Sequence, residues 1–153
     1  MAAFSPNEFR VSQDPSLWYK LSRLALAEVG VLLGAGLELG ALRECHDALE
    51  KILKAICAQQ GVLTDKDDTH KLVHLAKKCG VFDILDQETR WFLKDASGLH
   101  TDASYPEDEA MFRRLSDPAY VTMVFRETVT LFSKLKGIYE TGSMQPGNGE
   151  NSG

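Results

Sequence analysis

Apolar residues recur at helical spacing along most of the chain, and no segment alternates apolar and polar residues as a half-buried strand would. The clearest stretch spans residues 39–60, where one stripe repeats every three or four positions: Leu42, Cys45, Leu49, Ile52 and Ile56. This spacing places an apolar face along one side of a helix. Ala41, Ala48 and Ala55 run beside the stripe, and such small side chains let a neighbouring helix approach closely. The pattern predicts an all-α protein.

Capping signals mark the ends of the other predicted helices. Asp14-Pro15 starts a first helix that ends or kinks near residues 34–36, and Ser116-Asp117-Pro118 starts a last helix that reaches about Tyr139. Between them we predict a short helix over 70–79, a fourth long helix over 82–97 and a polar link over 99–109. Long helices with short links pack as an up-down four-helix bundle, here with one short additional helix.

The 153 residues are enough for one domain with a core of its own. We expect this domain to cover residues 14–140. The flanking residues 1–13 and 141–153 are predicted to be disordered, because the tail is rich in Gly and Pro and has almost no apolar side chains.

Charge and cysteine content narrow the class of protein. The net charge of −5 does not indicate general nucleic-acid binding, although it leaves room for a local basic groove. The three cysteines form no CxxC pair, so neither a disulfide framework nor a zinc knuckle is indicated. No secretory signal is apparent, and the longest apolar stretch is too interrupted to span a membrane. We expect a cytoplasmic protein without a cofactor or a membrane partner.

Few residues suggest chemistry on their own, and no phosphate-binding loop, GxSxG or HExxH motif is present. His70 and His74 share a helix face, but only Asp67 or Asp68 offers a further ligand nearby, so no metal site is expected. Glu50 and Lys54 lie four residues apart. They form either a surface ion pair contributing about 0.3–0.5 kcal/mol or a lysine beside a groove that holds a phosphate.

The segment from Leu99 to Glu107 brings together an imidazole, carboxylates, hydroxyls and a phenol before Pro106 ends the helix. Polar groups concentrated at a helix end are typical of a binding site. The same residues also suit a plain turn, with Asp102 and Ser104 as turn formers and Tyr105 as a half-buried anchor. Both interpretations stay open at this point.

Taken in order, these pieces resemble the HEPN family (higher eukaryotes and prokaryotes nucleotide-binding). The match rests on an aromatic residue, Trp18, in the first helix and on three motifs. Residues 48–55 are similar to E-x-x-x-K-A, residues 69–75 to H-x-L-x-x-L, and residues 105–107 to Y-P-D. The resemblance implies a dimeric four-helix bundle with the polar segment lining a cleft near the dimer axis. It also implies partnership with a separately encoded minimal nucleotidyltransferase, as in a toxin–antitoxin-like pair.

The chain departs from the family members that cut RNA, which carry Arg, four to six residues and then His. Here nine residues separate Arg90 from His100, about 15 Å along a continuous helix, and Ser104 stands where the family often has Arg. The sequence therefore favours a homodimeric binding module for a nucleotide, RNA or a nucleotidyltransferase. Its expected ligand-binding residues are Lys54, Glu50, His100, Asp102, Ser104 and Tyr105.

Two alternatives accompany this prediction. One is a divergent metal-independent ribonuclease in which Arg90 and His100 act together from different chains of the dimer. The other is a purely structural helical adaptor.

Overall fold

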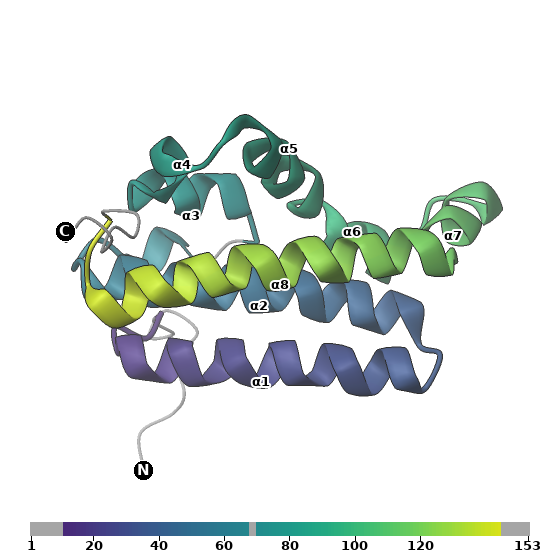
Figure 1. The fold of residues 1–153 in the computed structure, drawn as a ribbon, viewed down its shortest axis with the longest axis horizontal. Helices are drawn as coiled ribbons and strands as arrows, with labels where there is room; N and C mark the ends of the chain where they lie inside the picture. The colour runs from purple at the N-terminus through teal and green to yellow at the C-terminus, as the bar shows by residue number, and fades with distance from the viewer. Residues whose placement is uncertain (1–10, 68–69, 145–153) are drawn as a thin grey trace, which may run out of the picture.

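Three long helices lie side by side along the longest axis of the molecule: α1 (Pro15–Gly34), α2 (Glu38–Gln59) and α8 (Pro118–Thr141) (Figure 1). The computed structural model describes residues 11–67 and 70–144, and none of these residues forms a strand. Helix α2 contacts both of the other long helices. The prediction of an all-α protein is confirmed.

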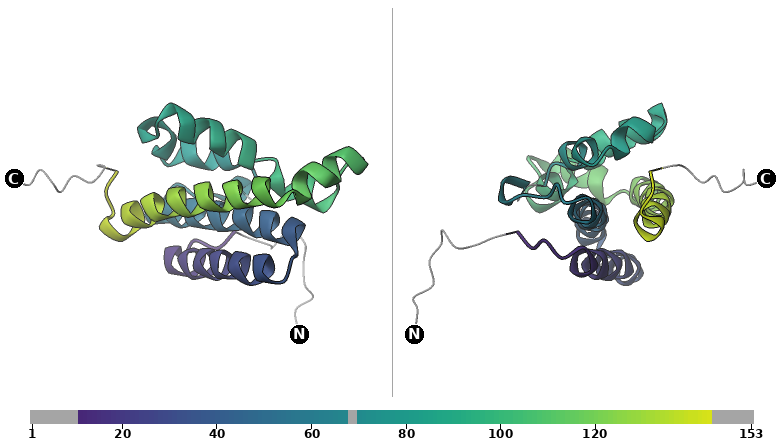
Figure 2. Two further views of the ribbon diagram at one scale, coloured as in Figure 1. Left: turned by 45° about the vertical axis from the view of Figure 1, so that its right-hand side comes forward. Right: turned by 90° about the vertical axis from the view of Figure 1, so that its left-hand side faces the viewer.

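Helix α2 is the centre of the core. Its predicted apolar stripe is at most 1% exposed, and Ala41, Ala48 and Ala55 are fully buried beside it. A helix that is buried around most of its circumference needs neighbours on several sides. Short helices provide the remaining cover, since α1 and α8 leave one side of α2 open to them (Figure 2).

The close approach at Ala48 can be tested by changing its size. Ala48→Leu should lower the free energy of unfolding by about 1–3 kcal/mol, because the added atoms have no space in a packed interface. Cys45→Ala removes a single buried sulfur atom and should cost about 1 kcal/mol or less. Urea midpoints in the reverse order would show that Ala48 does not face a neighbouring element.

The short helices form a layer on the side of α2 away from α1 (Figure 1). After a 3-10 turn at Asp65–Asp67 they follow in sequence as α3 (Leu72–Lys78), α4 (Val81–Ile84), α5 (Gln87–Ala96), α6 (Leu99–Ser104) and α7 (Glu109–Ser116). Contacts from α3, α6 and α7 reach α2 directly. This layer occupies the place where a fourth long helix was predicted.

The prediction of one continuous helix over 82–97 is wrong. The backbone becomes extended at Leu85, and Asp86 then caps α5 by accepting a hydrogen bond from the Thr89 amide at 2.8 Å. The predicted polar link over 99–109 is also wrong in part, because it contains α6. Asp108 caps α7 in the same way, through the Met111 amide. Both aspartates are N-caps, which the apolar periodicity alone does not reveal.

The packed chain begins before the predicted boundary at residue 14. Val11 is buried, and its amide donates to Asp65 Oδ1 at 3.0 Å. Trp18 Nε1 donates to the carbonyl oxygen of Ser12 at 2.8 Å. The remainder of the predicted disordered ends, residues 1–10 and 145–153, lies outside the described residues. Within the described part, no helix has the length and apolar character needed to cross a membrane.

A pair of carboxyl groups lies between α1 and α2. Burial, followed by a hydrogen bond with Glu28 and the negative charge of Asp47, raises the pKa of Glu44 to about 7. An unfolded glutamate titrates near 4.3. As the pH rises between these two values, the unfolded chain loses the Glu44 proton more readily than the folded one, so the wild-type protein loses stability over this window.

Glu44→Gln should remove this penalty. Since Glu44 is only partly buried and solvent screens its charge, we expect the variant to be more stable than the wild type by only about 1 kcal/mol at pH 8. The advantage should be absent at pH 4.5. Urea unfolding at both pH values measures it, and an equal difference at the two values would contradict the raised pKa.

Candidate functional site

One face of α2 carries three polar side chains into the core. His46, Glu50 and Lys54 lie at four-residue intervals and are 0%, 5% and 3% exposed. Lys54 Nζ donates to Glu50 Oε2 at 2.8 Å, and the Trp18 ring lies 4.9 Å from the same ammonium group. The predicted pair between Glu50 and Lys54 thus exists inside the molecule, where Lys54 is closed off from solvent.

Two further histidines reach this face from the layer of short helices. His70 lies just before α3, and its Nδ1 is 2.7 Å from Glu50 Oε1. His100 lies on α6, and its Nδ1 is 3.4 Å from Asp47 Oδ1. The rings of His70 and His100 stack on each other, with centroids 3.9 Å apart and planes 17° from parallel. We call His46, Asp47, Glu50, His70 and His100 the histidine cluster.

The histidine cluster extends from the core to the surface. His46 is fully buried, and its Nε2 is 2.9 Å from the carbonyl oxygen of His70. The side chains of His70 and His100 are 56% and 33% exposed. His100 Nδ1 nevertheless faces inward and is buried without a hydrogen-bond partner. The outer parts of two stacked rings therefore face solvent, and their inner edges face carboxylates.

Asp47 is ionised within the histidine cluster. Burial opposes its charge, but contact with the His46 ring and the positive charge of Lys51 hold the pKa of Asp47 below its usual range. The cluster thus has an ionised carboxylate beside the imidazoles of His46 and His100.

His74 belongs to a separate group around Asp67. His74 Nε2 is 2.8 Å from Asp67 Oδ1, and Lys78 and Thr64 donate to the other oxygen of that carboxylate. Burial disfavours the charged form, but these donors hold the pKa of Asp67 well below its usual range. His70 and His74 therefore turn to different carboxylates, and they do not form the two-histidine grip weighed from their spacing.

Arg90 lies on α5 and is held by α4. Its Nε and one terminal nitrogen donate to the carbonyl oxygens of Phe82 and Asp83, each at 3.0 Å, and its guanidinium lies 5.0 Å from the Phe82 ring centroid. Among the described residues, Arg90 shares no hydrogen bond or ion pair with His100. One chain by itself therefore does not bring the two catalytic candidates together.

The other predicted site residues continue along α6 from His100. Asp102 and Ser104 are half-buried, and Tyr105, which ends the helix, is 77% exposed. In the portion of the chain that the structure describes, none of the three forms a hydrogen bond or ion pair with the histidine cluster. They provide polar and aromatic surface beyond it.

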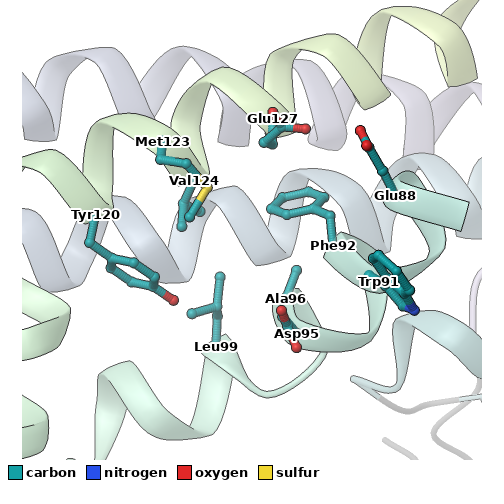
Figure 3. Close-up of a pocket in the computed structure, with 10 residues that line it drawn as sticks. All are labelled: Glu88, Trp91, Phe92, Asp95, Ala96, Leu99, Tyr120, Met123, Val124 and Glu127. Atoms are coloured by element: carbon teal, nitrogen blue, oxygen red, sulfur yellow. The ribbon is translucent and has the colours of Figure 1, made fainter.

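A pocket of about 290 Å³ lies between α5, α6 and α8 (Figure 3). Apolar and aromatic side chains form most of it: Trp91, Phe92, Ala96, Leu99, Tyr120, Met123 and Val124. Three carboxylates, Glu88, Asp95 and Glu127, also line it. Trp91 and Phe92 thus lie together at one apolar, acidic pocket.

Comparison with known protein families matches residues 16–136 to the HEPN domain. The chain belongs to the HEPN family. The resemblance inferred from Trp18 and the three motifs is confirmed. No curated protein and no solved structure matches the chain.

The inner half of the site in this HEPN protein was not predicted from its sequence. His46 and Asp47 were not candidates, and as a ligand His70 was considered only together with His74. One signal was available, because His46 precedes Glu50 by four residues and so shares its helix face. The partners of that face come from α6 and the start of α3, and no local pattern indicates which loop will cover a helix.

Proposed function

We propose that this HEPN protein is a homodimeric binding module that holds a nucleotide or single-stranded RNA against the exposed rings of His70 and His100. The observation that carries the proposal is the stacking of these two imidazoles at the surface, 3.9 Å apart. Unpaired bases stack on flat side chains such as histidine and tyrosine, and each stacked base contributes about 1–3 kcal/mol.

The surface is preorganised by the buried groups behind it. Lys54 donates a hydrogen bond to Glu50, and Glu50 is hydrogen-bonded to the His70 ring. His46 is hydrogen-bonded to the backbone carbonyl of His70. Glu50 and Lys54, both predicted to bind ligand, act here as positioning residues that keep the His70 ring in place. A ring that is already fixed loses little conformational entropy when a base stacks on it.

The end of α6 supplies the remaining contacts in this proposal. Tyr105 is the most exposed of the large aromatic side chains described and offers a second flat surface. Asp102 and Ser104 can hydrogen-bond base edges or a ribose 2′-hydroxyl, which distinguishes RNA from DNA.

The proposal is tested by fluorescence anisotropy with a labelled single-stranded RNA. His70→Ala and Tyr105→Ala should each weaken binding about tenfold, and His70→Phe, which keeps a flat ring, should preserve it. His74→Ala is the matched control, because it removes a half-exposed histidine that also contacts a buried carboxylate. Equal affinities in all four variants would contradict the proposed face.

A metal-independent ribonuclease is the second candidate, because two adjacent imidazoles can act as general acid and general base, and Glu50 orients one of them. This chemistry also needs a cation to stabilise the charge that develops on the phosphate. To provide it across a dimer, Arg90 would have to leave the carbonyl oxygens of Phe82 and Asp83.

We therefore expect little or no cleavage of single-stranded RNA by the wild-type protein, with or without added metal ions. Gel analysis after incubation under binding conditions measures it. Cleavage that His100→Ala and Arg90→Ala each abolish, at unchanged thermal stability, would replace the binding module with the ribonuclease.

The outer face of α1 supports the homodimer. Leu17, Leu24 and Val31 follow at seven-residue intervals on this face and are 42%, 58% and 72% exposed. Gly30 and Gly34 lie near Val31, and a Cβ atom added to either would have no neighbour within 4 Å. Glycine inside a helix costs about 1 kcal/mol relative to alanine, and packing within one chain does not require it here. Close approach of α1 from a second copy of the chain would require glycine at these positions.

The acidic pocket supports a different partner. Trp91 and Met123 are 57% and 43% exposed at an opening with several carboxylates, so the pocket suits an apolar side chain from a basic segment. We place the family's minimal nucleotidyltransferase here, in a toxin–antitoxin-like pair. Glu88→Lys and Glu127→Lys should together abolish co-purification with such a partner while leaving RNA binding unchanged.

A further inference from the structure

The ring of His46 has one nitrogen whose role is determined by its neighbour. Its Nε2 is 2.9 Å from the carbonyl oxygen of His70, and a carbonyl only accepts, so Nε2 carries a proton. The other nitrogen, Nδ1, is 3.4 Å from Asp47 Oδ1 and 3.7 Å from Glu50 Oε1.

This arrangement places His46 Nδ1 between two carboxylates in the core, where the ring is 0% exposed. Lys54 neutralises the far oxygen of Glu50, Oε2. His100 Nδ1 is 3.4 Å from the same Asp47 oxygen and is buried without a hydrogen bond. A cation among these atoms would be attracted by both carboxylates and would give the His100 nitrogen a partner.

We propose that the histidine cluster binds one divalent transition-metal ion of the zinc type, with the imidazoles of His46, His70 and His100 as ligands. One ring nitrogen from each lies within 4.8 Å of the other two, and the same limit joins His46, Asp47 and Glu50. Asp47 supplies the carboxylate nearest to His46 and His100.

The chemistry of the donors fits this class of ion. Imidazole and carboxylate groups bind zinc at about 2.1 Å, and two ligands of a tetrahedral ion are then about 3.4 Å apart. The contacts of Asp47 Oδ1 with His46 and His100 have this length. The bond from His46 Nε2 to the His70 carbonyl is the outer contact that orients a metal-binding imidazole. No metal was expected from the sequence, because His70 and His74 lacked further ligands; α2 and α6 provide them to His70.

Metal binding would use the ring nitrogens of the histidine cluster, whereas a stacked base would use the faces of the rings, so the two can be tested separately. The test uses the full chain freed of metal and titrated with Zn²⁺ in a calorimeter and with Co²⁺ in a visible spectrometer, where the Co²⁺ spectrum reports coordination. We expect one ion per chain. His100→Gln and His70→Phe should each lower the affinity at least about tenfold, and the control His74→Gln should leave it unchanged.

Both ligand variants replace partly exposed side chains, so the test does not depend on whether the buried variant His46→Gln folds; circular dichroism checks each one. Asp47→Asn, at a residue that has no part in the proposed RNA contacts, should weaken metal binding and leave RNA binding unchanged, which separates this proposal from the preceding one. Affinity unchanged in both variants would mean an adventitious ion and overturn the site. Absence of Zn²⁺ and Co²⁺ binding by the folded wild-type protein would overturn it too.

Discussion

Glu50→Ala should lower the free energy of unfolding by about 3–5 kcal/mol, the largest single-residue effect that we expect in this protein. The reason is the group left behind. Lys54 is 3% exposed and its Nζ has Glu50 Oε2 at 2.8 Å, so the substitution leaves a buried ammonium without its carboxylate. His70 loses its Nδ1 partner at the same time. Urea unfolding followed by circular dichroism measures the loss.

An exposed ion pair provides the control. Glu109 and Arg113 have the same four-residue spacing, but their side chains are 70% and 79% exposed, so Glu109→Ala should cost only about 0.5 kcal/mol. The double variant Glu50→Leu with Lys54→Met should recover most of the stability, because it removes both buried charges together. A Glu50→Ala cost no larger than that of Glu109→Ala would mean that Lys54 reaches water.

Leu24→Glu should convert the proposed dimer into a monomer. Leu24 lies in the middle of the exposed α1 face, between Leu17 and Val31. In a two-fold interface one substitution is present twice, so two carboxylates would enter an apolar contact together. Light scattering at micromolar concentration should give about twice 17.0 kDa for the wild type and 17.0 kDa for the variant.

Val129→Glu is the matched control for this experiment. Val129 is an exposed apolar residue on a different long helix, α8, and its substitution should leave the dimer intact. A wild-type mass of 17.0 kDa would remove the dimer from the proposed function. Dissociation by Val129→Glu but not by Leu24→Glu would move the contact from α1 to α8.

The long helices could be predicted because their signals are local. Asp14 and Asp117 each cap a helix that begins with proline, and both accept the backbone hydrogen bonds expected of an N-cap. The stripe from Leu42 to Ile56 is long enough to define a helix and its buried face. The order of these pieces along the chain indicated the HEPN family, and the family match over residues 16–136 confirms it.

The layer of short helices could not be predicted in the same way. Periodicity over residues 82–97 continues across Leu85, where the backbone leaves the helix, because an apolar side chain can be buried from either conformation. Periodicity also says which face of α2 is apolar but not how many layers cover it. From the sequence alone, Lys54 could therefore be a surface lysine. In the structure, Trp18 of α1 covers it. The histidine cluster depends on the same long-range packing.

The histidine ring resonances of the wild-type protein, followed by NMR during titration with single-stranded RNA, test the binding module most directly. The proposed function predicts that the ring resonances of His70 and His100 shift progressively and reach a plateau, because a base stacks on these rings and displaces water. The ring resonances of His74, which is hydrogen-bonded to Asp67 in a separate group, should not shift. RNA that binds without moving the His70 and His100 resonances, or that fails to bind, would contradict the account.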